Sequence, residues 1–306
     1  MKKILLILLA SVLFAITPQK ITFDGYISKV AFNNKYLVSG LENGDVVIKD
    51  FNSLKNIYVI HLPKIEDFMG DKIAMPIYSL DIYKDELLIL AGGEDSKREF
   101  FMFDIKTKKL NHIFTSKDTF MKAKFIKDKV FFAYLSDEIS LYDIKTQKFI
   151  YKTQIGHYVF STFALNSDKS IAAIGDESGI LKIVNTKNGK LIAKLKGFNK
   201  DQTLSVDIYK NLVINGSSDK RVAIYNINTK NSMLELQAKF LPYGASINNN
   251  KFAIQFDEKN NIALYDFNKD MKLLKGHTMP LNGMKFINAN ELLSYSPAEI
   301  IIWKLK

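Results

Sequence analysis

The sequence contains no cysteine and only two arginines among its 306 residues. Without cysteine the protein has no disulfides, no thiolate ligands for zinc, no cysteine-ligated iron–sulfur cluster and no covalently attached c-type haem. These absences exclude most electron carriers, and they also exclude a lipoprotein anchored through a lipidated cysteine. We therefore expect a protein with no cofactor and no metal.

The sequence also lacks an apolar run of membrane-spanning length. Lys2 and Lys3 precede a 13-residue segment, Ile4 to Ile16, that is almost entirely apolar, whereas a helix that crosses a bilayer needs about 20 such residues. A short basic start followed by a short apolar run is typical of a secretory signal. We predict a cleavable signal over residues 1–16, export to the periplasm, and a mature chain over residues 17–306 without a transmembrane span.

Arginine is nearly absent although the formal net charge is +11, so the positive charge comes almost entirely from lysine. Such a balance can attract nucleic acid. The lysines are scattered through the turns instead of forming one run, and exported proteins seldom meet nucleic acid, so we expect no nucleic-acid partner. The 47% hydrophobic content is that of a globular chain with a large core.

A short strand-like segment that ends in an acidic or amide residue returns about every 40 residues, the period of a four-stranded propeller blade. The final residues of successive copies lie 38 to 54 positions apart and cover the chain after the signal. Seven copies predict an all-β fold, a single seven-bladed β-propeller. The copies are Val47 to Asp50, Phe101 to Asp104, Ser140 to Asp143, Lys182 to Asn185, Ala223 to Asn226, Ala263 to Asp266 and Ile301 to Lys304.

Each period divides into four strand-length runs separated by turn-forming residues. In the fourth copy the runs are Tyr158 to Leu165, Ser170 to Gly175, Ile180 to Asn185 and Leu191 to Leu195. An aspartate often precedes the third run, where its carboxylate can accept backbone N–H bonds and hold the turn. We predict this structural role for Asp137, Asp176, Asp219 and Asp257.

The segment from Ser217 to Asn226 resembles the inner hairpin of WD40 repeats. Gly156-His157 and Gly276-His277 stand where that family places its Gly-His pair, and His277 lies 26 residues before Trp303. The resemblance implies a WD40-like propeller in which His157, His277 and Trp303 are structural residues of the repeat. Most copies replace the tryptophan by Tyr, Phe or Val.

The two ends of the repeat region complement each other. The last copy contains only three runs, Leu281 to Ile287, Glu291 to Tyr295 and Glu299 to Leu305. We predict that Lys20 to Phe23 supplies the missing outer strand, because pairing the two ends in one blade protects open sheet edges and closes the ring.

No catalytic motif is present: the sequence has no Gly-x-Ser-x-Gly elbow, no phosphate-binding glycine loop and no His-Glu-x-x-His. The four histidines are isolated from one another. The adjacent carboxylates Asp176-Glu177, Glu94-Asp95 and Glu66-Asp67 are better explained as solvated turns than as an acid–base pair, because neighbours on a strand point to opposite faces. We expect a protein that is not an enzyme.

Two irregular segments interrupt the repeat and are the candidate partner site. The linker from His61 to Pro76 is about a dozen residues longer than its counterparts, and the next copy extends its inner hairpin over Gly92 to Glu99. Both connections should emerge on the same face of a propeller and lie side by side, and variable loops on a rigid scaffold commonly carry binding sites. The predicted partner-binding residues are Phe68 and Met69 as apolar anchors, Met75, Glu94 and Asp95, and Arg98 as a charged contact at the rim.

The signal, the size, the lack of cysteine and the degenerate seven-copy repeat together resemble the periplasmic WD40-like accessory proteins of the NapL family, which some bacteria encode with the periplasmic nitrate reductase. This resemblance implies a non-catalytic, monomeric scaffold that supports nitrate respiration by binding a protein partner such as a component of the reductase. Two alternatives stay open. One is a scaffold for envelope protein assembly, although the related propeller would carry a lipidated cysteine, and the other is a propeller hydrolase or a metal- or sugar-binding protein.

Overall fold

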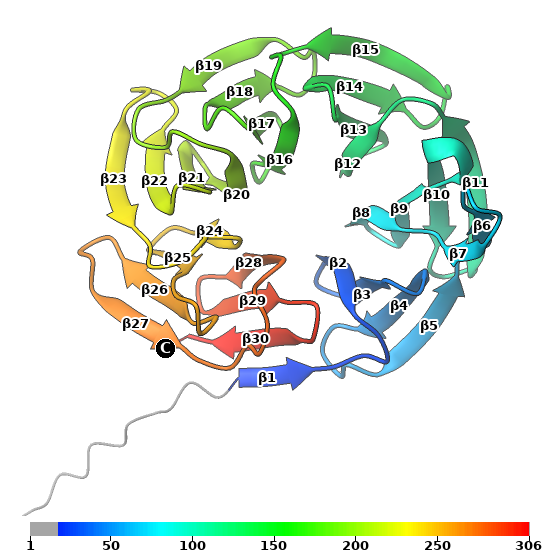
Figure 1. Cartoon of the computed structure of the whole chain (residues 1–306), viewed down its shortest axis with the longest axis horizontal. Coiled ribbons are helices and arrows are strands. Elements are labelled where there is room, and N and C mark those ends of the chain that lie inside the picture. The colour runs from blue at the N-terminus through cyan, green and yellow to red at the C-terminus, as the bar shows by residue number, and fades with distance from the viewer. Residues whose placement is uncertain (1–17, 306) are drawn as a thin grey trace, which may run out of the picture.

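The structure is a computed structural model, and it describes residues 18–305. The predicted signal, residues 1–16, lies outside the described residues. Seven four-stranded antiparallel sheets, here called blades 1 to 7 in chain order, surround a central axis (Figure 1). The chain is therefore an all-β, seven-bladed β-propeller, as the repeat predicts.

Within a blade the strands lie side by side in order from the axis to the rim (Figure 1), and each pairs antiparallel with the next. Blades 1 to 3 comprise β2 (Ile27–Phe32), β3 (Tyr36–Leu41), β4 (Asp45–Asp50) and β5 (Asn56–His61); β8 (Ile77–Tyr83), β9 (Glu86–Gly92), β10 (Arg98–Asp104) and β11 (Lys109–Ser116); β12 (Phe120–Ile126), β13 (Lys129–Tyr134), β14 (Glu138–Asp143) and β15 (Lys148–Gln154).

Blades 4 to 7 repeat the same order, except that the outer strand of blade 7 comes from the start of the described chain. They comprise β16 (Phe160–Leu165), β17 (Ile171–Asp176), β18 (Leu181–Asn185) and β19 (Leu191–Leu195); β20 (Thr203–Tyr209), β21 (Leu212–Ser217), β22 (Arg221–Asn226) and β23 (Ser232–Gln237); β24 (Ala245–Ile247), β25 (Lys251–Gln255), β26 (Ile262–Asp266) and β27 (Met271–Leu274); β28 (Gly283–Asn288), β29 (Glu291–Tyr295), β30 (Ile300–Lys304) and β1 (Pro18–Ile21).

The core lies between neighbouring blades. The second and third strands of each blade are almost wholly buried, because both of their faces pack on adjacent sheets. Seven hydrophobic clusters result, one for each junction between neighbours around the ring. Continuous runs of β-branched and aromatic residues suit strands that are buried on both faces.

The ring closes where the two ends of the described chain meet. β1 pairs antiparallel with β30, and Lys20 lies opposite Ile301. The prediction that the first segment completes blade 7 is confirmed, but the strand covers residues 18–21 and not 20–23. The reason is that Ile21 already faces Ile300, the first residue of β30, so no partner remains for Thr22 and Phe23.

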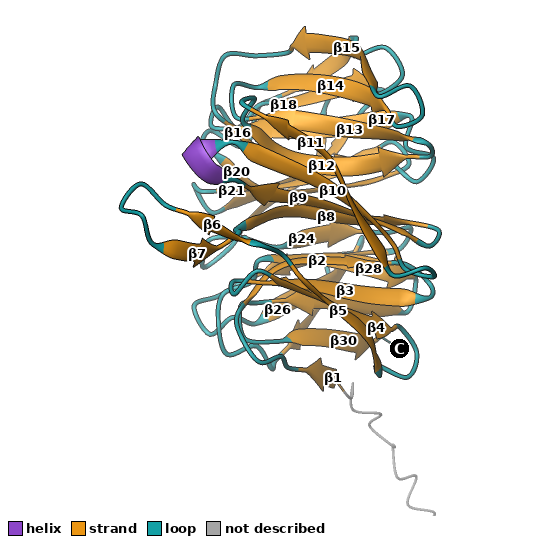
Figure 2. Ribbon diagram, turned by 90° about the vertical axis from the view of Figure 1, so that its right-hand side faces the viewer, coloured by secondary structure: helices purple, strands orange, loops and turns teal. Residues whose placement is uncertain are grey.

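Two elements stand outside the blades: the antiparallel pair β6 (Lys64–Glu66) and β7 (Lys72–Ala74), and a short 3₁₀ helix, η1 (Glu94–Ser96). Figure 2 shows both on the same side of the ring. Among residues 18–305, no helix is long and apolar enough to cross a membrane.

Candidate functional site: the two insertions

The longer insertion folds into an ordered hairpin whose tip is apolar. The Asp67 carboxylate accepts the backbone N–H groups of Met69 at 2.8 Å and Asp71 at 2.9 Å, which holds the turn between β6 and β7. Phe68 and Met69 follow directly and remain 96% and 73% exposed. The hairpin stands out from the ring (Figure 2), so these two side chains form its most prominent apolar feature.

The base of the hairpin is fixed in the core between blades 1 and 2. Ile65 and Met75 are buried in that hydrophobic cluster and pack with Leu62 and Ile77. The prediction of Met75 as a partner-binding residue is therefore wrong. Its side chain anchors the insertion instead, because the chain at this point turns inward to begin β8.

The shorter insertion, between β9 and β10, lies against this hairpin. Its tip is η1, where Glu94 and Asp95 are exposed, and the Glu94 carboxylate accepts the backbone N–H of Glu66 at 3.3 Å. This hydrogen bond joins the two segments, which confirms that the insertions form one neighbouring surface. We call residues 64–74 and 93–97 the insertion surface.

Arg98 closes the inner end of this surface but does not belong to its rim. Its guanidinium donates to the carbonyl oxygens of Phe120 and Ser96, each at 2.9 Å, and stacks over the Tyr78 ring with 4.0 Å to the centroid. The residue is 8% exposed. The predicted rim contact is therefore wrong: Arg98 directs its guanidinium into the protein and ties blade 2 to blade 3.

The insertion surface is acidic although the chain as a whole is basic. It carries five carboxylates and three lysines. One lysine, Lys97, is paired with Asp95 at 3.1 Å. Three large apolar side chains, Phe68, Met69 and Ile73, are exposed within it. The surface therefore presents an apolar tip with a mildly negative surround.

Two of the predicted repeat residues, His277 and Trp303, belong to a buried hydrogen-bond network in blade 7. The Trp303 indole donates to Ser294 Oγ at 2.8 Å, and Ser294 Oγ lies 2.7 Å from His277 Nε2. His277 Nδ1 lies 3.0 Å from a Glu299 carboxylate oxygen. All donors are satisfied when Ser294 donates to Nε2 and neutral His277 donates from Nδ1. Sequence reasoning identified His277 and Trp303 but missed Ser294 and Glu299.

Charges within this network are set by burial and hydrogen bonding. Burial lowers the pKa of His277 to about 4, although Glu299 opposes the shift. Burial acts to raise the pKa of Glu299, but hydrogen bonds from the Thr278 backbone and hydroxyl, from Ser296 and from His277 outweigh it and lower this pKa to about 2. At neutral pH a neutral imidazole therefore faces a carboxylate.

His157 does not form such a network, because its side chain is exposed. Gly156 beside it is packed against an ionic cluster instead: a Cβ there would lie 2.0 Å from Asp137 Oδ2. Asp137 accepts from Lys182 Nζ at 2.6 Å, and Lys182 also contacts Asp176. All three side chains are nearly inaccessible, at 4% or less. Burial raises the pKa of Asp137 to about 6, although Lys182 opposes the shift.

Three of the four predicted turn aspartates accept hydrogen bonds from backbone N–H groups of the turn that follows them. Asp176 accepts the N–H of Ser178, Asp219 that of Arg221, and Asp257 those of Lys259 and Asn261. Asp137 differs because its carboxylate is directed to Lys182 in the next blade. Within residues 18–305, no three His, Cys, Asp or Glu side chains come together in an arrangement able to hold a metal ion.

Comparisons with known proteins bear on the fold alone. No protein-family model and no curated protein matches this chain by sequence. Among solved structures, the crystal structure of the computationally designed protein Ika8 is similar to it, with a TM-score of 0.66 and 15% sequence identity over 93% of this chain and 98% of Ika8. At this identity the likeness supports the propeller architecture and does not reach to function.

Proposed function

We propose that this protein is a non-catalytic binding platform of the periplasm that captures a protein partner through the insertion surface. A propeller suits such a role because its interlocked blades hold surface loops in fixed positions. The observation that carries the proposal is the exposed Phe68-Met69 pair on an ordered hairpin. Large apolar side chains at a rigid tip are typical anchors of protein interfaces.

The chemistry of the surface defines the partner that would fit it. Phe68 and Met69 would enter an apolar pocket, and the Asp67 turn already holds them in place, so little conformational entropy is lost on binding. The carboxylates of Glu66, Asp71 and Glu94 would face basic residues around that pocket. A partner with a basic rim around an apolar pocket is therefore favoured.

For the identity of the partner we propose a component of the periplasmic nitrate reductase system, which this protein would help to mature or keep active. The support is the resemblance of the signal, the size and the degenerate repeat to the NapL accessory proteins. Placement of the gene beside those of a periplasmic nitrate reductase would strengthen the assignment, and placement elsewhere would weaken it.

The central test is the double substitution Phe68→Ser and Met69→Ser. Loss of both anchors is expected to weaken binding of purified periplasmic nitrate reductase, measured by biolayer interferometry, at least about tenfold. Stability should change by no more than about 0.5 kcal/mol, because both side chains are already in water.

A matched control removes apolar surface elsewhere on the ring. Met233 and Met271 lie on outer strands and are 59% and 47% exposed, so Met233→Ser with Met271→Ser removes similar side chains far from the insertions in sequence. This control should bind as the wild type does. Equal binding by the Phe68/Met69 variant and the wild type would reject the insertion surface, and no binding of the wild type would reject the proposed partner.

A further inference from the structure

The two faces of the ring differ in charge, because the topology brings each kind of connection to one face. The turns from the first to the second strand of a blade, and from the third to the fourth, share one face. The remaining connections, including both insertions, lie on the opposite face (Figure 2). Between the blade strands of residues 18–305, the first face carries 13 lysines and 4 aspartates, and the opposite face 10 lysines and 15 carboxylates. We call the first the basic face.

The lysines of the basic face are spread around the ring and reach solvent. Blades 1 to 6 each contribute at least one, and all are exposed except Lys169, which is partly buried. They are Lys35, Lys55, Lys84, Lys106, Lys108, Lys127, Lys145, Lys169, Lys187, Lys190, Lys210, Lys230 and Lys269. In the part of the chain that the structure describes, only Lys35, Lys106 and Lys169 of this set form ion pairs. Most of the positive charge of this face is therefore uncompensated.

Seven of these lysines hold a backbone conformation that lysine adopts with strain. Lys84, Lys108, Lys127, Lys169, Lys210, Lys230 and Lys269 have φ between 53° and 71°, in the left-handed region. Glycine and asparagine enter this region more easily, so turn geometry alone would favour them. On the opposite face Lys220 is the one lysine with such a φ among residues 18–305. Lysine is thus concentrated on the basic face against the local preference, which indicates that its charge has a use there.

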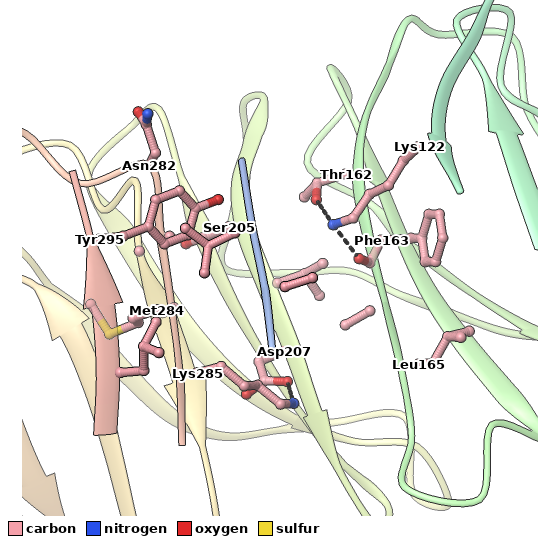
Figure 3. A pocket seen from close by; sticks show the side chains of 18 of the residues that line it. Lys122, Thr162, Phe163, Leu165, Ser205, Asp207, Asn282, Met284, Lys285 and Tyr295 are labelled. Carbon is pink, nitrogen blue, oxygen red and sulfur yellow. Dashed lines mark hydrogen bonds and ion pairs between the residues drawn. The ribbon is translucent and has the colours of Figure 1, made fainter. Parts of the chain in front are cut away.

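The lysines of the central channel differ because the protein itself engages them. They line a cavity of about 410 Å³. Lys122 donates to Thr162 Oγ1 at 2.9 Å and to the Phe163 carbonyl at 2.7 Å, and Lys285 pairs with Asp207 (Figure 3). The basic face, and not the channel, therefore offers lysines for an external partner.

We propose that the basic face docks the ring on the surface of a bilayer that contains anionic phospholipid. A planar anionic surface meets lysines of six blades at once, whereas a compact acidic partner reaches only some of them. Lysines close to such a membrane are attracted by its negative surface potential, and no part of the protein has to cross the bilayer.

The start of the described chain lies on the same face. β30 runs from the turn at Glu299, on the opposite face, toward the basic face, and β1 is antiparallel to it. Pro18, which lies opposite Trp303, therefore begins β1 near the basic face. The predicted signal directly precedes Pro18 and would be in the membrane until cleavage. An exported ring would thus already hold its basic face close to the bilayer.

Docking through this face directs the insertion surface away from the bilayer, because the two lie on opposite sides of the ring (Figure 2). Phe68 and Met69 would remain free to meet the protein partner. The two proposals can fail separately: the variant with Phe68→Ser and Met69→Ser should bind vesicles as the wild type does, and a ring that binds no vesicles could still capture its partner in solution.

Co-sedimentation of the mature chain, residues 17–306, with vesicles tests the docking. We expect binding to vesicles of phosphatidylcholine with about 30% phosphatidylglycerol, and none to vesicles of phosphatidylcholine alone. Raising the salt concentration from about 0.1 M to about 1 M should release the protein, because the Debye length falls from about 10 Å to about 3 Å.

The basic face is tested by Lys145→Gln, Lys187→Gln and Lys230→Gln in one variant. These three exposed lysines occupy the turn between the third and fourth strands of blades 3, 4 and 5. One lysine near an anionic surface contributes about fivefold to binding, so the variant should bind the anionic vesicles at least about twentyfold more weakly.

A matched control removes the same charge from the opposite face. Lys196, Lys200 and Lys220 are exposed on connections of blades 4 and 5, and their joint replacement by glutamine should leave vesicle binding as in the wild type. Circular dichroism establishes that both triple variants retain the ring.

Three results would overturn the proposal. The first is that the wild type does not bind anionic vesicles at about 0.1 M salt. The second is an equal loss of binding in the two triple variants, which would show that net charge governs binding whichever face carries it. The third is binding to immobilised poly-glutamate but not to the vesicles, which would assign the basic face to an acidic protein.

Discussion

Blade 7 and the junction between blades 3 and 4 both bury polar side chains, but they do so with different chemistry. In blade 7 a chain of hydrogen bonds runs from Trp303 through Ser294 and the neutral His277 to the Glu299 carboxylate. At the junction, Lys182 lies between two carboxylates of Asp137 and Asp176. The first network connects its groups through hydrogen bonds, and the second places the lysine between two carboxylates.

The difference follows from which blades each network connects. Blade 7 is closed by β1, and its network fixes the loop before β28 within a single blade. Asp137 belongs to blade 3, whereas Asp176 and Lys182 belong to blade 4, so the ionic cluster joins two sheets. Buried charges without full pairing are costly, and they therefore make the junction the more sensitive of the two sites.

The largest expected effect comes from Lys182→Met. Its loss leaves two buried carboxylates facing each other with no cation, and breaking a buried ion pair in this way costs about 3–5 kcal/mol. Urea unfolding, followed by the fluorescence of the single tryptophan Trp303, measures the change. Lys194→Met, on the exposed part of β19, should alter stability by about 0.5 kcal/mol or less.

Adding Asp137→Asn and Asp176→Asn to Lys182→Met removes the uncompensated charges and should recover part of the lost stability. A loss below about 1 kcal/mol for Lys182→Met alone would show that the cluster is not essential, and that water or relaxation of the loop at Gly156 compensates the carboxylates.

A smaller effect is expected from Ser294→Ala in blade 7. Its hydroxyl is shared by the Trp303 indole and by His277, so its removal leaves one donor and one acceptor without a partner in a dry site. This should cost about 2–3 kcal/mol in the same urea assay. Ser232→Ala is the matched control: its hydroxyl bonds only Glu235 on the exposed face of β23, and stability should hardly change. Equal effects of the two substitutions would contradict a network role for Ser294.

These two sites also show which features of the structure could be predicted from the sequence. The 40-residue period predicts seven blades, and the ranges Leu191 to Leu195 and Glu291 to Tyr295 match β19 and β29. The repeat period and the turn-forming residues can be recognised from short stretches of the sequence. The Gly-His pairs look alike in sequence, yet only His277 enters a network, because that outcome depends on a serine and a glutamate brought close by folding.

The errors at the candidate site have a similar cause. Met75 and Arg98 belong to irregular segments, where no alternation of side chains indicates which residues point inward. Phe68 and Met69 could be predicted as exposed because they lie between turn-forming residues.

Lowering the pH should change the stability contributions of the two networks in opposite directions, because the pKa of His277 is lowered and that of Asp137 is raised. The folded pKa of His277 is depressed, so its contribution is present above about pH 6.5 and is lost as the pH falls toward 4. The folded pKa of Asp137 is raised, so its contribution is fully present below about pH 3.8 and is lost as the pH rises through 6. Between pH 7 and 5, blade 7 should lose stability while the junction gains it.

Variants that cannot titrate make this contrast measurable. When the pH falls from 7 to 5, the free energy of unfolding of the wild type should decrease by about 2 kcal/mol relative to that of His277→Gln. Over the same interval it should increase by about 1 kcal/mol relative to that of Asp137→Asn. Urea midpoints at the two pH values provide both differences, and common titrations elsewhere in the ring cancel. Parallel slopes for the two variants would mean that the networks do not hold the protonation states derived from their hydrogen bonds. Opposite slopes would establish that burial disfavours the charged form of His277 in blade 7 and the charged form of Asp137 at the junction between blades 3 and 4.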